Sequence, residues 1–105
     1  MRRRKRYAQK AKILKIMLTP FYTSQFKKDF KHQERRNKNI QSLEEIITFL
    51  ISEKGLSHQY RDHPLKGKFK NFRECHIESD WLLIYKQEGD NIYFIRTGTH
   101  SDLFE

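Results

Sequence analysis

The chain has 105 residues, the size of a single domain. Its one cysteine, Cys75, excludes a disulfide framework and a cysteine-based zinc site, and no apolar run approaches the roughly 20 residues of a membrane span. The net charge of +9 is uneven, because residues 1–40 hold fourteen Lys or Arg against two acids. This imbalance favours binding to phosphate backbones, with an acidic protein partner as the alternative.

The N-terminal region divides into two parts. Residues 1–12 are almost entirely basic and polar, and we expect a flexible basic arm followed by one domain over residues 13–105. The apolar run Ile13–Leu18 predicts a first strand that ends near Pro20. Lys15 interrupts this run and no small-residue cleavage site follows it, so we expect a cytoplasmic protein without a signal peptide.

Two helices are predicted next. Thr23 or Ser24 can cap the first, which should end near Asn37–Asn39, with Phe26 and Phe30 on one face. The second is predicted from apolar residues that recur at helical spacing, namely Ile40, Leu43, Ile46, Ile47, Leu50 and Ile51. A Ser42–Glu45 capping box would start it, and Gly55 would follow its end.

The second half of the chain predicts a loop and three strands. The loop covers Leu56–Asn71, and the strands cover Phe72–Glu78, Trp81–Lys86 and Ile92–Thr97. Their short connections imply antiparallel neighbours, and the apolar run 81–85 places the middle strand at the centre. The expected fold class is therefore α+β in the order β-α-α-β-β-β, with a helical hairpin packed on one face of a small antiparallel sheet.

Strand alternation groups the polar residues. It places Glu74 and His76 on one face of their strand, and Arg73 and Cys75 on the other. If the last strand stays extended, Ile92, Phe94, Arg96 and His100 share one of its faces. Ile92 and Phe94 would then reach the core, with Arg96 and His100 at its rim. The sheet would then bring His76, Arg96 and His100 to one edge, with His63 from the preceding loop.

Three histidines in a basic domain suggest acid–base chemistry on an anionic substrate, because imidazole can donate or accept a proton near neutral pH. Each residue also has a structural explanation: His63 before Pro64 can fix a turn, His76 can be a core histidine, Asp80 can be a turn residue, and Arg96 can pair with Asp102. A metal site is the rival chemistry, but the histidine spacings of thirteen and twenty-four residues match no common zinc motif. Cys75 is a weaker candidate, since it lies on the face opposite His76.

Four segments carry a resemblance to a known family. They are Tyr60–Gly67 (YRDHPLKG), Phe72–Glu78 (FRECHIE), Asp80–Tyr85 (DWLLIY) and Arg96–Phe104 (RTGTHSDLF). In this order they resemble YafQ-type toxins of the RelE/ParE toxin–antitoxin superfamily, and the similarity extends from about Ile13 to the C-terminus.

The resemblance implies a RelE-like fold and a metal-independent, ribosome-dependent mRNA endoribonuclease that needs no cofactor and is held inactive by a cognate antitoxin. By position, His63, His76, Asp80 and His100 match the family's catalytic residues. Arg96 and Phe104 match positions implicated in activity, and Glu74 stands where some members have Asp. The residues expected to contact the substrate or the ribosomal RNA are Phe104, Trp81, Arg73, Lys27, Lys28 and Lys31.

In the resulting hypothesis the 2′-OH of the RNA attacks the adjacent phosphate. His100 acts as the general acid, Asp80 or His63 as the base, and His76 assists; Arg96 stabilises negative charge and Phe104 stacks on a base or anchors the core. Two alternatives are a non-catalytic or decayed module that binds nucleic acid or antitoxin, and a ParE-like gyrase poison on the same fold.

Overall fold

The computed structural model of the chain describes residues 17–105. The expected basic arm at residues 1–12, and residues 13–16 of the predicted first strand, lie outside this region. No helix among the described residues is long and apolar enough to cross a membrane.

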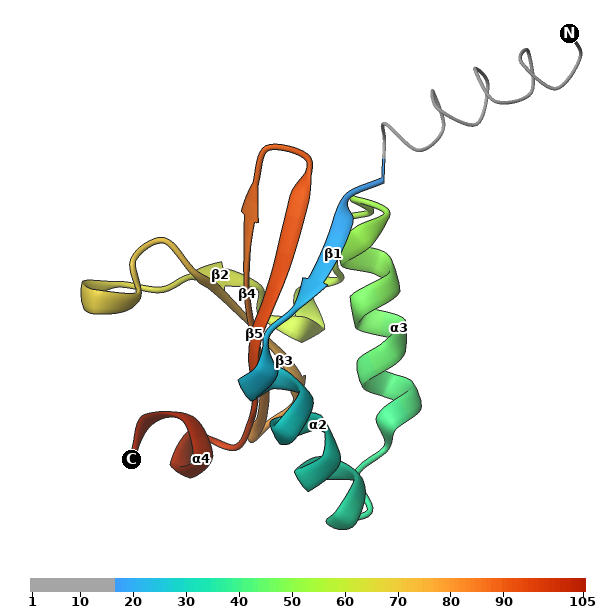
Figure 1. Cartoon of the computed structure of the whole chain (residues 1–105), viewed down its shortest axis with the longest axis vertical. Coiled ribbons are helices and arrows are strands. Elements are labelled where there is room, and N and C mark those ends of the chain that lie inside the picture. The colour runs from blue at the N-terminus through green and yellow to red at the C-terminus, as the bar shows by residue number, and fades with distance from the viewer. Residues whose placement is uncertain (1–16) are drawn as a thin grey trace, which may run out of the picture.

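A five-stranded sheet forms the centre of the structure, in the order β1-β5-β4-β3-β2 (Figure 1). Its strands are β1 (Thr19–Tyr22), β2 (His63–Pro64), β3 (Arg73–Glu78), β4 (Trp81–Glu88) and β5 (Asn91–Gly98). Neighbouring strands are antiparallel except for β1, which pairs in parallel with β5. The expected antiparallel pairing therefore holds for β2 to β5, whereas the parallel pairing of β1 makes the sheet mixed.

The first strand begins later than predicted. Met17 and Leu18 precede it, and Pro20 lies inside it, where the prediction ended the strand. An edge strand tolerates proline because one of its sides needs no backbone N–H for the ladder. Leu18 instead enters the core, and its N–H donates to the carbonyl of Ile51 at 2.8 Å.

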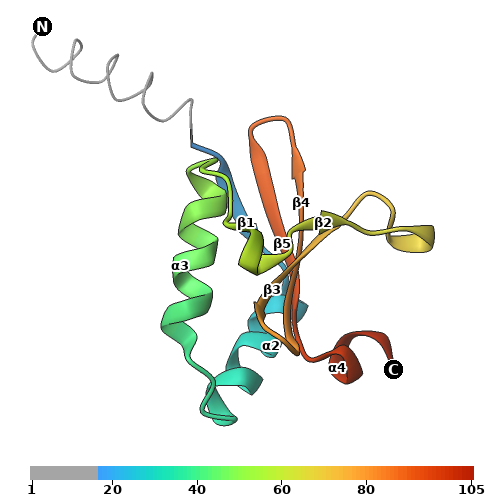
Figure 2. The same ribbon diagram turned by 180° about the vertical axis from the view of Figure 1, so that it is seen from behind.

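Helices α2 (Ser24–Arg35) and α3 (Ile40–Ile51) cover one face of the sheet, as expected (Figures 1 and 2). Thr23 caps α2 by accepting the N–H of Phe26 at 2.9 Å. The predicted cap of α3 was wrong, because the Asn39 side chain accepts the N–H of Ser42 and Ser42 lies inside the helix. Glu53, at φ 56°, takes the left-handed position after α3 that was predicted for Gly55.

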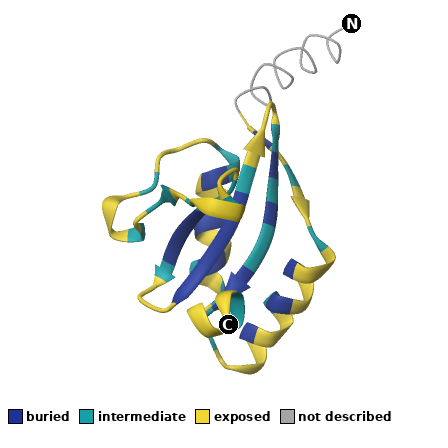
Figure 3. Cartoon of the chain, turned by 90° about the vertical axis from the view of Figure 1, so that its left-hand side faces the viewer, coloured by how far each residue is buried: buried dark blue, intermediate teal, exposed yellow. Residues whose placement is uncertain are grey.

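The core lies between the two helices and the sheet. Trp81, Leu83 and Tyr85 of β4 pack there against Phe26 of α2 and Leu43 of α3. The predicted central strand is confirmed, because β4 has two strands on each side and residues 81–85 are all buried. The opposite face of the sheet carries the 65–72 loop and the C-terminal helix α4 (His100–Phe104), and Figure 3 looks toward this side.

Two features of β5 differ from simple alternation. The register shifts between Ile84 and Tyr85, so that Tyr85 pairs with Phe94 but Ile84 pairs with Arg96. Because paired residues share a face, this β-bulge places Arg96 on the face opposite Phe94, contrary to the prediction. The chain then turns into α4 after Gly98, so His100 begins a helix instead of continuing an extended strand.

Candidate active site

The three predicted histidines form a row beside the sheet. His76 is the middle member, with its ring centroid 6.1 Å from that of His63 and 6.1 Å from that of His100. Phe104 continues the row at 6.3 Å from His100. The rings come from β2, β3 and α4, so only the tertiary fold brings them together.

His100 is held by Asp80, which follows β3 in the turn to β4. The Oδ1 atom of Asp80 accepts both the backbone N–H of His100 at 2.9 Å and its ring Nδ1–H at 2.6 Å. These bonds, that from the backbone first, hold the pKa of the Asp80 carboxyl below its usual range. With Nδ1 used in this way, Nε2 is the ring nitrogen left for a substrate, and the side chain is 53% exposed.

His63 is oriented from both sides. Its Nδ1–H donates to the carbonyl of Arg61 at 2.6 Å, and this fixes the tautomer because a carbonyl can only accept. Its Nε2 lies 3.2 Å from Oε2 of the buried carboxylate of Glu74. A proton taken up at Nε2 would therefore be stabilised at once by a negative charge.

His76 shares the same carboxylate, with its Nε2 at 3.6 Å from Glu74 Oε2. Its Nδ1 lies 3.3 Å from a guanidinium nitrogen of Arg61 and 3.4 Å from the carbonyl of Ser79. Burial, followed by the positive charge of Arg61, lowers the pKa of His76. Nδ1 can accept from Arg61 when it is unprotonated or donate to the Ser79 carbonyl when it carries a proton, but it cannot do both at once.

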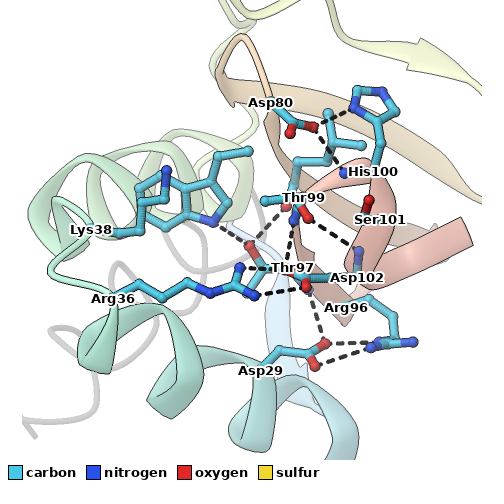
Figure 4. Close-up of polar contacts among 12 residues, drawn as sticks. Asp29, Arg36, Lys38, Asp80, Arg96, Thr97, Thr99, His100, Ser101 and Asp102 are labelled. Atoms are coloured by element: carbon cyan, nitrogen blue, oxygen red, sulfur yellow. Dashed lines mark hydrogen bonds and ion pairs between the residues drawn. The ribbon is translucent and has the colours of Figure 1, made fainter. Parts of the chain in front are cut away.

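A second network fixes α4 to α2 (Figure 4). Arg36 donates to both carboxylate oxygens of Asp102, at 2.6 and 2.9 Å. Asp102 also accepts the N–H of Thr99 at 2.9 Å in a capping box at the start of α4. The hydrogen bonds from Arg36 hold the pKa of Asp102 well below its usual range. This network sets the position of the helix that carries His100.

Arg96 belongs to a separate network between β5 and α2, away from the histidine row. Its guanidinium donates to both oxygens of Asp29 on α2, at 2.8 and 3.1 Å, and Asp29 also accepts the N–H of Thr97. The structural alternative of an Arg96–Asp102 pair was wrong, because these residues bind Asp29 and Arg36 respectively. The structure thus places the Arg96 charge against a carboxylate.

Three other groups of predicted contact residues also lie outside the row. Trp81 is 0% exposed and its indole N–H donates to Thr97 Oγ1 at 3.0 Å, so its predicted contact with substrate is corrected to a core role. Arg73 pairs with Asp62 and stands opposite Tyr85, on the helix-covered face of the sheet. The lysines Lys27, Lys28 and Lys31 are exposed on α2.

Cys75, the weaker candidate for nucleophilic chemistry, is buried. Burial raises the pKa of its thiol and leaves it unsuited to nucleophilic attack.

Sequence reasoning missed two residues beside the row. Arg61 adopts φ 46°, a conformation that is uncommon outside glycine, and contacts both His63 and His76. Phe69 meets Phe104 edge-to-face, with centroids 5.8 Å apart. Arg61 lies in the motif Tyr60–Gly67, and its position beside Asp62 and His63 could have pointed to a role in the site. No sequence feature predicts the contact between Phe69 and Phe104.

His63, Glu74 and His76 are also the one group in the described region that could hold a metal ion, with ligand atoms within 4.8 Å of one another. Two imidazoles and a carboxylate match the donor set of some catalytic zinc sites. The arrangement therefore fits either a metal ion or a carboxylate-bridged pair of imidazoles.

Comparisons with known proteins identify the family. The profile of the family described as "Bacterial toxin of type II toxin-antitoxin system, YafQ" matches residues 18–105. The mRNA interferase toxin YafQ of Escherichia coli K12 is 43% identical over 84 residues, covering 79% of this chain and 91% of that protein. A protein named putative toxin YafQ, from Haemophilus influenzae, is 34% identical over 87 residues, covering 76% and 85% respectively.

Solved structures share the fold. A chain of the E. coli DinJ–YafQ toxin–antitoxin complex has a TM-score of 0.80 at 40% identity and covers 85% of this chain and 99% of its own. A metal-bound toxin from Helicobacter pylori has a TM-score of 0.79 at 38% identity, covering 84% and 100%. The expected RelE-like α+β fold is confirmed, and the chain belongs to the YafQ family of bacterial toxins of type II toxin–antitoxin systems.

Proposed function

We propose that this protein is a cytoplasmic, ribosome-dependent mRNA endoribonuclease that a cognate antitoxin neutralises. The name of the E. coli relative, mRNA interferase toxin, and the DinJ–YafQ complex support the activity class and the partner. The observation that carries the proposal is the row of three histidines, in which each end ring is oriented by a carboxylate.

In the proposed reaction the 2′-oxygen of the RNA bonds to the adjacent phosphorus and the bond from phosphorus to the 5′-oxygen breaks. His63 is the better-placed base of the two considered, because Asp80 already accepts two N–H groups of His100. Neutral His63 takes the 2′-OH proton at Nε2, and Glu74 stabilises the resulting imidazolium at 3.2 Å.

His100 is the proposed general acid. Asp80 holds its Nδ1–H, so that a proton on Nε2 faces outward and can be given to the departing 5′-oxygen. The products are then a 2′,3′-cyclic phosphate and a 5′-OH. Base and acid lie at opposite ends of the row with His76 between them, an arrangement that suits entry and departure on opposite sides of the phosphorus.

Positive charge is needed beside the phosphate while the bonds exchange. Arg96 was expected to supply it, but its guanidinium is neutralised by Asp29 in this structure. Arg61 contacts the middle ring of the row, and no ion pair among residues 17–105 involves it. We therefore assign charge stabilisation to Arg61, with Arg96 as the earlier candidate to be tested beside it.

The ribosome would supply both grip and alignment of the mRNA. The exposed lysines Lys27, Lys28 and Lys31 of α2 form a basic surface that suits the backbone of ribosomal RNA. Such a surface would also suit acidic segments of an antitoxin.

End-mapping of mRNA on translating ribosomes tests the proposal, with wild type compared with His100→Ala. Wild type should produce new 5′-OH ends, and the substitution should lower the cleavage rate by about 10²–10⁴-fold. Growth arrest with intact transcripts in wild type would overturn the proposal. DNA breaks with intact mRNA would support a gyrase poison instead, and salt-sensitive RNA binding without scission would support a decayed binding module.

A metal ion on His63, Glu74 and His76 is the second candidate, favoured by the convergence of their ligand atoms and by the metal-bound H. pylori relative. A bound metal would act as a Lewis acid or activate a water molecule. It would occupy the lone pair that His63 needs as a base, so in the proposed mechanism added Zn²⁺ should inhibit and chelation should leave cleavage intact. Loss of cleavage after chelation, with recovery on adding Zn²⁺, would reverse the assignment.

A further inference from the structure

The segment 65–72 (LKGKFKNF) is an ordered loop that projects from the sheet on the side of α4 (Figures 1 and 2). The N–H of Leu65 donates to the carbonyl of Phe72 at 2.9 Å and closes its base. Within it, Lys70 and Phe72 donate to the carbonyls of Gly67 and Phe69, at 3.1 and 2.9 Å. Gly67 has φ 67° at the start of the 3₁₀ turn Gly67–Phe69. These bonds fix the loop before any partner arrives.

The loop places an aromatic ring beside the histidine row. Phe69 meets Phe104 edge-to-face at 5.8 Å, and Phe104 lies 6.3 Å from His100. Phe104 is 41% exposed, so the pair presents apolar ring surface to solvent next to the proposed general acid. The alternative role for Phe104, an anchor in the core, does not account for this exposure.

Positive charge follows the same loop. Lys66, Lys68 and Lys70 occupy every second position and are all exposed, and none of them has an ion-pair partner within the described part of the chain. The ammonium of Lys68 lies 5.4 Å from the Phe69 ring centre. Cations that alternate with an aromatic ring are the pattern by which proteins hold single-stranded nucleic acid, through backbone charge and base stacking.

We propose that residues 65–72 form a substrate-binding loop for single-stranded RNA, in which Phe69 and Phe104 make a stacking platform for the nucleobase beside the cleaved linkage. Lys66, Lys68 and Lys70 hold the phosphates that lead to it. The proposal extends the proposed function, since it assigns Phe69 and these lysines to binding of the same substrate.

An acidic protein segment could use the lysines, but it has no need of the platform. The rings lie at the end of the histidine row, where a nucleotide flanking the reacting phosphate would be found. Their ring planes stand at 83° to each other, so a base that stacks on the face of one ring meets the edge of the other. The combination favours RNA over a protein partner.

Binding of the full-length chain to a fluorescein-labelled RNA dodecamer tests the proposal without cleavage. The probe carries 2′-O-methyl groups, which remove the attacking hydroxyl. Phe69→Ala should raise the Kd by about tenfold to a hundredfold, the value of one lost stacking interaction, and Phe69→Trp should restore it. Phe49→Ala is the control, because it removes an exposed phenylalanine from α3 on the other side of the molecule.

The lysines are tested by the salt dependence of the same Kd. Lys68→Gln should reduce the slope of log Kd against log salt by about 0.7, the value for one phosphate contact on a single strand, whereas Lys54→Gln should not change it. Absence of wild-type binding at low salt, or an unchanged Kd for Phe69→Ala, would overturn the proposal. So would variants that lose complex formation with the antitoxin but still bind RNA. Neither binding experiment requires cleavage of the RNA. RNA binding without cleavage would therefore contradict the proposed function and leave the binding loop supported.

Discussion

At the scale of single residues, the candidate site depends on two carboxylates with different tasks. Glu74 is buried and lies near two imidazoles, whereas Asp80 is exposed and binds His100 twice through one oxygen. The first can stabilise a proton gained at His63, and the second selects which nitrogen of His100 faces the substrate. Both side chains end in a carboxylate, so the difference between their roles must come from their surroundings.

Asp80→Asn tests the orienting role. An amide oxygen can still accept from His100 but lacks the negative charge, so we expect the cleavage rate at saturating toxin to fall by less than the ~10²–10⁴-fold expected for His100→Ala. Urea unfolding should change little, because Asp80 is exposed. Asp90→Asn, at the exposed turn between β4 and β5, is the matched control. An unchanged rate for Asp80→Asn would show that the contact is not used.

Arg61→Ala tests the source of positive charge. We expect the single-turnover rate to fall by about 10²–10³-fold, as for other lost donors to a transition state, with partial recovery in Arg61→Lys. Arg96→Ala, in contrast, leaves Asp29 buried without its partner and should act mainly on the free energy of unfolding. The opposite pattern, with stable protein but lost activity for Arg96→Ala alone, would return the role to Arg96.

At the scale of elements, the short helix α4 depends on contacts outside itself. Five residues are too few for a stable isolated helix, so its position comes from the Thr99–Asp102 capping box and the bidentate bond to Arg36 of α2. The element that carries the general acid is thus anchored to the helix that carries the basic surface.

Asp102 makes this anchor sensitive to acid. Its folded-state pKa is lowered, so the unfolded chain binds more protons than the native protein as the pH falls through the usual Asp range near 4. The stabilisation is present above that range and is lost as the pH drops toward the folded pKa. Urea unfolding between pH 3 and pH 7 should show a smaller acid loss for Asp102→Asn than for wild type. Parallel curves would contradict this assignment.

Gly98→Ala tests the packing under α4. A methyl group at this position would lie 2.8 Å from both Cβ and Oδ2 of Asp102, so the helix or the carboxylate must move. We expect a loss of about 1–3 kcal/mol in the free energy of unfolding, together with a slower cleavage rate. Gly55→Ala is the control, because nothing lies within 4 Å of its new methyl group. Equal effects of the two substitutions would contradict the packing argument.

At the scale of the whole molecule, the basic surface of α2 and the histidine row occupy different sides of the fold. The 65–72 loop and α4, whose first residue is His100, lie on the sheet face away from α3 (Figures 1 and 3). Lys27, Lys28 and Lys31 are exposed on α2. Such an arrangement suits a protein that binds a large RNA surface with one side and presents its histidine row to a single-stranded RNA with the other.

Replacement of Lys27, Lys28 and Lys31 by Gln tests this division. We expect weaker binding to ribosomes and a shallower salt dependence, since each lost phosphate contact removes one released counterion. The cleavage rate at saturating toxin should stay near wild type, because the histidine row is unaltered. A lower rate at saturation with unchanged ribosome affinity would place these lysines in the chemical step.

The local elements could be predicted from the sequence because their signals are local. The apolar stripe of α3, the Thr23 cap of α2 and the buried run of β4 each reflect contacts within one element or one layer. The alternation in β3 likewise placed Glu74 and His76 on one face, which the pairing with Ile84 and Leu82 confirms. The family motifs pointed to His63 and His100, although their roles remain predictions.

Only the tertiary structure decided where the charges meet. A one-residue bulge beside Phe94 reverses the side on which Arg96 lies, and the short helix α4 gives His100 its contact with Asp80. The pairing of Arg96 with Asp29 and of Phe69 with Phe104 joins residues far apart in the chain. Side-chain pairing of this kind depends on the register and packing of whole elements, and residue order carries no local signal of it.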